Sequence, residues 1–143
     1  MSLETRLARV RGLGSAKDGT HHWWAQRLTA VALVPLTIWF AVSVAGMTGG
    51  NYAEAVAWVG SPVNTVLLLL LIAATFHHVQ LGIQVVLEDY VHGEGAKIAA
   101  LMFVKFACAI LAVASGYAVL RVAFVGEFKR GKFSDLVSLL SGR

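Results

Sequence analysis

The sequence predicts an all-α integral membrane protein with three transmembrane helices in an up-down bundle and short interfacial N- and C-terminal segments. Its 143 residues are 57% hydrophobic and only 14% charged, against roughly 45–50% and about 25% in an average soluble domain. The apolar residues form three long blocks, at 28–46, 63–87 and 98–120. Each block is long enough for a helix that crosses a hydrocarbon core about 30 Å thick. The length allows a single membrane domain, 1–143, and no second one.

Charge and cysteine content exclude two classes of function. The net charge is +4, but the charged residues sit at the ends of the apolar blocks and do not form the basic stripe that binds nucleic acid. Cys108 is the only cysteine, so the chain can form neither an internal disulfide nor a thiolate metal site. We therefore expect no nucleic-acid partner and no cysteine chemistry.

The first span, at 28–46, carries no charged residue and includes Pro35, which we expect to kink the helix. An arm of 27 residues precedes it. A cleaved signal peptide has a shorter basic start and an apolar stretch of about 7–15 residues, so we expect the helix to be retained. In the arm, Leu3, Leu7 and Val10 recur at helical spacing with arginines between them. This pattern favours a short helix on the membrane surface, with a frayed terminus as the alternative.

The second span, at 63–87, has clear ends in the sequence. Ser61 and Pro62 supply an N-cap residue and a proline at the first helical position, and Gly93 and Gly95 follow its last residues. Its only ionisable side chains are two histidines. These two residues are therefore the first places to look for function.

The third span, at 98–120, contains Lys105 as its only charged residue. A lysine about two turns inside a span can extend its ammonium toward the headgroups, so we assign Lys105 a structural role. The tail that follows, 121–143, is basic. Its apolar residues favour an interfacial segment, with a frayed end as the alternative. These apolar residues are Phe128, Phe133, Leu136, Val137 and Leu140.

The basic residues near the spans predict the orientation. Five of them precede the first span, whereas the loop after it has none and carries Glu54. We therefore expect a cytoplasmic N-terminus in a bacterial cytoplasmic (inner) membrane, with the loop 88–97 on the same side. The tail argues against this orientation, because it adds five positive charges on the opposite side: Arg121, Lys129, Arg130, Lys132 and Arg143.

An ionisable residue inside a span is costly and hence a candidate for function. His77 and His78 are adjacent in the sequence, so their side chains diverge by about 100° and at most one can be a ligand from this helix. The structural alternative is an interhelical hydrogen bond. The functional one is a haem, since a neutral imidazole binds haem iron and the macrocycle is apolar. A second histidine ligand would have to come from a partner subunit.

The surroundings favour His78 over His77. Gly82 follows it by four residues and lies on the same face, where a glycine lets a flat ring or a helix come close. Asp89 follows it by eleven residues, which is three turns with about 20° of drift and a rise of about 16 Å. Tyr90 stands beside the acid. The tyrosine is either an interfacial anchor or, with Asp89, a group that bonds or protonates a ligand.

The end of the arm, 19–27, lies across the cytoplasmic surface from these residues by topology. It holds His21, His22, Trp23, Trp24 and Arg27, more than an aromatic belt needs. An arginine at the start of a span needs an anionic partner. A haem propionate and a phospholipid headgroup both fit that requirement.

The run from His78 through Asp89, Tyr90 and Val91 to Gly93 resembles a pattern of the succinate dehydrogenase (respiratory complex II) family: histidine, ten residues, Asp-Tyr-Val, in its hydrophobic membrane anchor subunits. The arm 19–27, continuing into 28–30, is similar to that family's entry to its first span. The resemblance covers about residues 12–125. It implies a chain that is not catalytic alone and belongs to a complex with a flavoprotein subunit, an iron–sulfur subunit and a second membrane (cytochrome b) subunit.

The resemblance also implies cofactors and residue roles. The two membrane subunits would share a b-type haem and form the site where ubiquinone is reduced. By position, His78 matches the axial ligand of the haem iron, Arg27 an arginine near the propionates, and His21 a histidine on the same side. Tyr90 matches a tyrosine that hydrogen-bonds a ubiquinone carbonyl, with Asp89 beside it. It implies no role for His77, His22 or the basic tail.

Two other readings remain open at the level of the sequence. The chain could be a haem-free anchor that docks a soluble enzyme on the membrane, with its histidines in helix contacts. It could also be a small transporter or channel subunit with His77 and His78 on a proton path. The second reading fits less well, because the spans carry few polar residues.

Overall fold

The computed structural model describes residue 10 and residues 17–140, with side chains described for 20–125 and for Val10 and Leu140. This part of the chain is helical, with no strand. Four helices follow one another: α2 (Lys17–Gly46), α3 (Tyr52–Val59), α4 (Pro62–Tyr90) and α5 (Glu94–Leu140). Three helical segments are long and apolar enough to cross a membrane, Thr20–Gly46, Pro62–Tyr90 and Glu94–Val125. The predicted all-α fold with three spans is confirmed.

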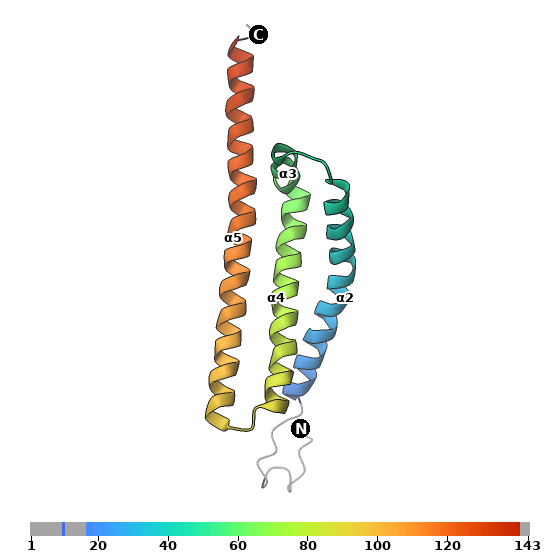
Figure 1. Ribbon diagram of the computed structural model, residues 1–143, viewed down its shortest axis with the longest axis vertical. Coiled ribbons are helices and arrows are strands. Elements are labelled where there is room, and N and C mark those ends of the chain that lie inside the picture. The colour runs from blue at the N-terminus through green and yellow to red at the C-terminus, as the bar shows by residue number, and fades with distance from the viewer. Residues whose placement is uncertain (1–9, 11–16, 141–143) are drawn as a thin grey trace.

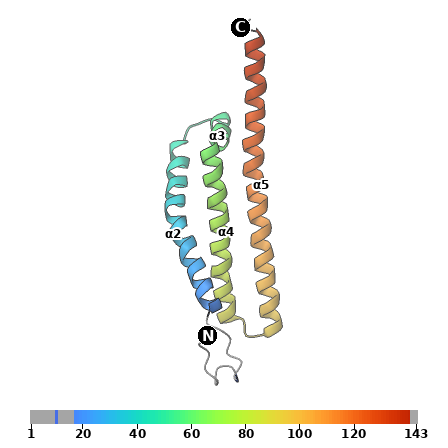
Figure 2. The same ribbon diagram turned by 180° about the vertical axis from the view of Figure 1, so that it is seen from behind.

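The three long helices alternate in direction and form one layer, with α4 between α2 and α5 (Figures 1 and 2). Within the described residues, α4 packs against both neighbours while α2 and α5 do not touch each other. A layer of this kind has almost no interior. Among the described side chains, the buried hydrophobic ones are Leu68, Leu81, Cys108 and Ala123. Both faces of the layer are therefore left for lipid or for another protein.

Helix α3 lies in the first loop, where the sequence analysis expected no helix. Asn51 caps it: its side-chain oxygen accepts a hydrogen bond from the Glu54 backbone N–H at 3.0 Å, and its amide donates to the Glu54 carboxylate at 3.1 Å. The Trp58 ring stacks on Trp39 of α2, with centroids 5.5 Å apart. Asn64 of α4 donates to the Trp58 carbonyl at 2.8 Å. These contacts hold α3 across one end of the layer.

Helix α4 begins with Pro62 after Ser61 in the N-cap position, as the sequence indicated. It ends at Tyr90, and three residues later α5 begins. This short link places the end of α4 beside the start of α5, and α2 begins at the same end of the layer (Figure 1). The candidate residues at the start of α2 and at the end of α4 therefore lie at one end of the molecule.

Two boundaries differ from expectation, and one predicted segment is not described. Pro35 lies inside α2, which begins well before residue 28 and takes in the end of the arm. Helix α5 runs for 47 residues, through residue 120 and on to Leu140, so no break separates the third span from the tail. The continuation projects beyond α3 (Figure 1). The surface helix predicted around Leu3 and Leu7 falls outside the described residues.

Candidate functional site

His78 is the point at which α2 and α4 make polar contact. Its Nδ1 lies 3.0 Å from the Thr29 hydroxyl oxygen, and its Nε2 lies 3.5 Å from the Gln26 side-chain nitrogen. The imidazole is half-buried. Gln26 and Thr29 are three residues apart on α2 and hence on one face of that helix. Both ring nitrogens of the candidate ligand are thus held by the neighbouring helix.

His77, the adjacent histidine, is exposed. The two side chains diverge by about 100° around α4, and within the described residues His78 is the one of the pair that hydrogen-bonds to α2. The interhelical hydrogen bond, which was the structural alternative for an intramembrane histidine, is present at His78. The Gln26 contact at Nε2 is the longer of the two, at 3.5 Å, so a metal ion could bind Nε2 in place of the Gln26 amide.

Residue 82, one helical turn after His78 on α4, is glycine. A Cβ added at Gly82 would meet only the Gln26 side-chain nitrogen, at 3.6 Å, which is an ordinary van der Waals distance. The chain itself therefore does not require glycine at this position. Something outside the chain, such as a flat ring or another helix, is a better reason for it.

Two buried polar atoms in this region have no hydrogen-bond partner: His22 Nε2 and Gln26 Oε1. They are four residues apart on α2, so both belong to the face that carries Thr29. Buried polar atoms are nearly always paired in native proteins. Each of the two atoms can therefore take a hydrogen bond from a group outside the chain.

Arg27 lies at the same level of α2 but is exposed. Its guanidinium lies 5.0 Å from the centroid of the Trp23 ring, and Trp23 meets Trp24 edge to face with centroids 5.2 Å apart. A cation–π contact uses the face of the guanidinium and leaves its N–H donors available. Arg27 can therefore still bind a carboxylate or a phosphate. His21, two turns earlier, is also exposed.

Asp89 and Tyr90 end helix α4, and both are exposed, the tyrosine by 78%. The backbone carbonyl of Tyr90 lies 3.1 Å from His92 Nδ1. The end of α4, which carries both residues, lies at the end of the layer where α2 begins (Figure 1). The structure brings Gln26 and Thr29 to His78, but it leaves Asp89, Tyr90, His21 and Arg27 open to groups from outside the chain.

Gln26 and Thr29 are the site residues that the sequence analysis missed. A signal was available: His22, Gln26 and Thr29 recur at spacings of four and three at the start of the first span. That spacing puts three polar side chains on one face. A polar face at the start of a membrane span predicts a polar partner on the next helix.

Lys105 lies away from His78, in a groove between α4 and α5. The groove is lined by Gln80 and Gln84 of α4 and by Leu101, Met102, Val104 and Lys105 of α5. Gln84 donates a hydrogen bond to the Glu88 carboxylate at 2.8 Å. The lysine therefore has amide groups across the groove on the neighbouring helix, and the structural role that we assigned to it stays a prediction.

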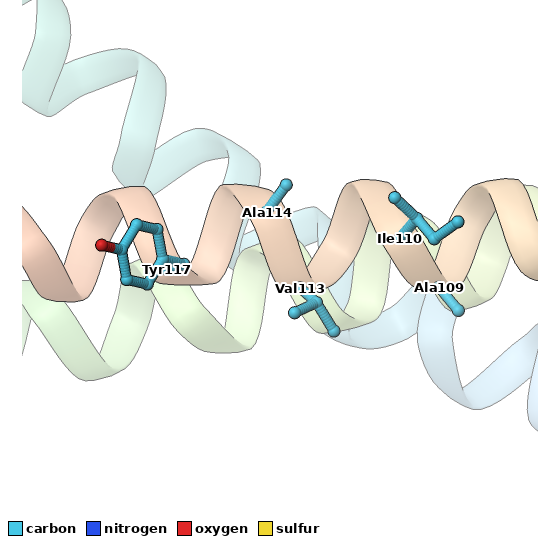
Figure 3. A pocket seen from close by; sticks show the side chains of 5 residues that line it. All are labelled: Ala109, Ile110, Val113, Ala114 and Tyr117. Atoms are coloured by element: carbon cyan, nitrogen blue, oxygen red, sulfur yellow. The ribbon is translucent and has the colours of Figure 1, made fainter.

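A second hollow lies on the outer side of α5. Figure 3 shows the side chains that line it, Ala109, Ile110, Val113, Ala114 and Tyr117, and all five stand on α5. The hollow is shallow and its lining surface is apolar. It offers packing for a lipid chain or a helix and no group for chemistry.

Comparison with known proteins places these features in a family. Residues 1–117 match the family model described as succinate dehydrogenase/fumarate reductase transmembrane subunit. The chain is 35% identical over 105 residues to the succinate dehydrogenase hydrophobic membrane anchor subunit of Paracoccus denitrificans. The aligned region covers 73% of this chain and 81% of the relative.

Two relatives with the same description come from Rickettsia. The protein of Rickettsia bellii is 33% identical over 85 residues, 59% of this chain and 68% of its own length. The protein of Rickettsia conorii is 28% identical over 112 residues, 78% of this chain and 89% of its own. No solved structure matches. Because the family model matches most of the chain, including α2, α3 and α4, the chain belongs to the family of succinate dehydrogenase and fumarate reductase transmembrane subunits.

Proposed function

We propose that the chain is the hydrophobic membrane anchor subunit of a succinate:ubiquinone oxidoreductase, and that it helps to hold a b-type haem and to form the site where ubiquinone is reduced. The observation that carries the proposal is His78, a half-buried imidazole inside an apolar span whose two nitrogens both face α2. Membership of the family and the names of the relatives support the same assignment.

The residues present fit a haem. A haem needs one imidazole nitrogen from this chain, and the only protein group at His78 Nε2 is a side-chain amide at the long distance of 3.5 Å. That amide can turn away, and His22 Nε2, the other unpartnered buried atom, lies one helical turn from it. Gly82 leaves room for a flat ring next to the backbone. A second ligand to the iron would have to come from the other membrane subunit.

The residues of this chain bind and orient the haem. The haem, when bound, supplies one-electron redox chemistry. His78 would hold the iron through Nε2. The exposed Arg27 guanidinium, held over Trp23, offers N–H donors to a propionate. The apolar flanks of α2 and α4 keep water away from the macrocycle, which raises the strength of these polar contacts.

Tyr90, Asp89 and His21 belong to the ubiquinone site in this proposal. Reduction of a quinone to a quinol takes two electrons and two protons. The Tyr90 phenol donates a hydrogen bond to a quinone carbonyl oxygen and favours the charge that develops there. Asp89, exposed beside it, exchanges protons with water at that end of the layer, and His21 assists from α2. All three are accessible, as residues that meet a diffusing substrate must be.

The open layer suits a subunit of a larger complex. A second membrane subunit covers one face and lipid covers the other, while the flavoprotein and iron–sulfur subunits dock at the end that holds Tyr90. In this proposal the N-terminus is cytoplasmic and the membrane is the bacterial cytoplasmic membrane, as the basic residues before the first span predict. The few buried side chains support a chain that completes its packing by assembly.

The test uses the purified complex, with adjacent histidines as matched variants. His78→Tyr should abolish most of the b-type absorption in a reduced-minus-oxidised spectrum, whereas His77→Tyr should retain it, because the His77 side chain is exposed. The haem-to-flavin ratio is the measurement. Equal loss in both variants, or equal retention, would contradict the assignment of His78.

One observation favours a second candidate, a haem-free anchor. Both nitrogens of His78 already have partners within the chain, so the histidine could serve only to join α2 to α4. The same spectrum separates the two functions. A fully assembled complex that reduces quinone and contains no haem would establish the haem-free anchor.

A further inference from the structure

We propose that Thr29 sets the protonation of His78: its hydroxyl oxygen accepts the Nδ1–H, so that the Nε2 lone pair is the one presented to the haem iron. Thr29 is then a positioning residue that acts through His78. The inference rests on the proposed function, because it concerns the same histidine and the same iron.

The argument begins with the single proton of the Thr29 hydroxyl. The hydroxyl oxygen lies 2.8 Å from the Ala25 carbonyl oxygen, 3.0 Å from the Gln26 carbonyl oxygen and 3.0 Å from His78 Nδ1. A threonine inside a helix commonly donates to the carbonyl four residues earlier, and here that contact is the shortest of the three. With the proton on the carbonyl side, the oxygen faces Nδ1 with a lone pair. Nδ1 must then carry the proton and donate it.

The other nitrogen agrees with this assignment. The Gln26 amide presents its nitrogen, a donor, to His78 Nε2 at 3.5 Å, and its oxygen has no partner. A donor facing Nε2 requires a lone pair there, because two N–H groups cannot share a hydrogen bond. A neutral imidazole has one protonated nitrogen and one bare nitrogen. With Nδ1 protonated toward the Thr29 oxygen, Nε2 is the bare nitrogen, and the assignment rests on the Thr29 contact.

This tautomer has a consequence for the iron. An Nδ1–H that donates a hydrogen bond raises the basicity of the metal-bound imidazole and fixes the orientation of the ring. A more basic ligand stabilises ferric over ferrous iron and lowers the reduction potential, one of the levers by which a protein tunes a haem. Loss of the Thr29 acceptor should therefore raise the potential.

The experiment compares three variants in the assembled complex. Thr29→Val keeps the shape and removes the acceptor, and Thr29→Ser keeps the hydroxyl. Thr37→Val is the matched control, because Thr37 makes the same bonds to the carbonyls of Leu33 and Val34 at 2.7 and 3.1 Å, and its side chain is exposed. Each complex is titrated between the reduced and oxidised haem spectra, and its haem-to-flavin ratio is measured.

We expect Thr29→Val to shift the reduced-to-oxidised ratio of the haem about three- to tenfold toward the reduced form, where tenfold corresponds to 59 mV for a one-electron couple. Thr29→Ser and Thr37→Val should titrate like the unchanged complex. An unchanged or lower potential in Thr29→Val, or an equal shift in Thr37→Val, would overturn the role of Thr29. If the complex contains no haem whose binding requires His78, that result would instead refute the proposed function.

Discussion

Replacement of Gly82 by alanine tests whether glycine is required for packing within the chain or for contact with a bound haem. Within the chain the new methyl group has room, since its nearest neighbour would be the Gln26 side-chain nitrogen at 3.6 Å. Alanine also favours a helix interior over glycine by roughly 0.8–1 kcal/mol. The α2–α4 contact should therefore survive or gain stability.

A ring that packs against the Gly82 backbone would be displaced by the same methyl group. Extra methyl groups in a tightly packed site cost about 1–3 kcal/mol, which lowers haem affinity by about five- to a hundredfold. The haem-to-flavin ratio of the complex, and the rate at which haem leaves it in detergent, measure this loss. Subunit stoichiometry shows whether the complex still assembles.

Gly116→Ala provides the control for the Gly82 variant. Its added methyl group would also meet a side-chain atom at 3.6 Å, Leu69 Cδ2, but at the contact of α5 with α4. This variant should keep its haem. Normal haem content in Gly82→Ala would refute the reasoning that a ring approaches the helix there, and equal loss in both variants would assign the effect to general destabilisation.

Three further outcomes are expected. Tyr90→Phe should raise the quinone concentration needed for half-maximal reduction and leave succinate oxidation by an artificial acceptor intact, since only the hydroxyl is lost; unchanged quinone kinetics would count against Tyr90. Arg27→Gln should speed haem loss from the complex, because a charged donor to the propionate is removed; the same rate as in the unchanged complex would exclude that contact. Asn51→Ala should destabilise α3 by about 1 kcal/mol and speed amide exchange at 52–59 about fivefold, and exchange that stays the same there would show that the cap is dispensable.

The three spans could be predicted from the sequence because hydropathy and length decide them locally. Apolar runs of this length have to be helical in a bilayer, where every backbone group needs an internal partner. The start of α4 was equally local, since Ser61 and Pro62 mark it. These features need no knowledge of any other part of the chain.

Helix α3 and the length of α5 were missed for a related reason. Hydropathy identifies membrane spans, and neither the eight residues of α3 nor the basic tail is a span. The cap of α3 was nevertheless visible as Asn51 followed three residues later by Glu54, a pattern close to a capping box. The charged residues after Arg121 were interpreted as a boundary, although charge does not stop a helix.

The contact between α2 and His78 could not be predicted from one sequence. Which residue of α2 lies opposite His78 depends on the register of the two helices, and Thr29 and His78 are 49 residues apart in the chain. The register follows from packing along the whole contact, including Leu81. The sequence therefore indicated His78, and it indicated Arg27 and His21 as candidate cofactor-binding residues of the arm, but the hydrogen bonds from Gln26 and Thr29 to His78 are visible only in the structure.

Because the helices form a single layer, the stability of this chain depends on the molecules that bind its two faces. A layer one helix thick has few interior contacts. Each molecule that binds its faces therefore raises the free energy of unfolding by mass action. Overproduction without matching amounts of the other membrane subunit should consequently leave an excess that proteases remove. The abundance of the anchor would then be set by its companion and not by its own rate of synthesis.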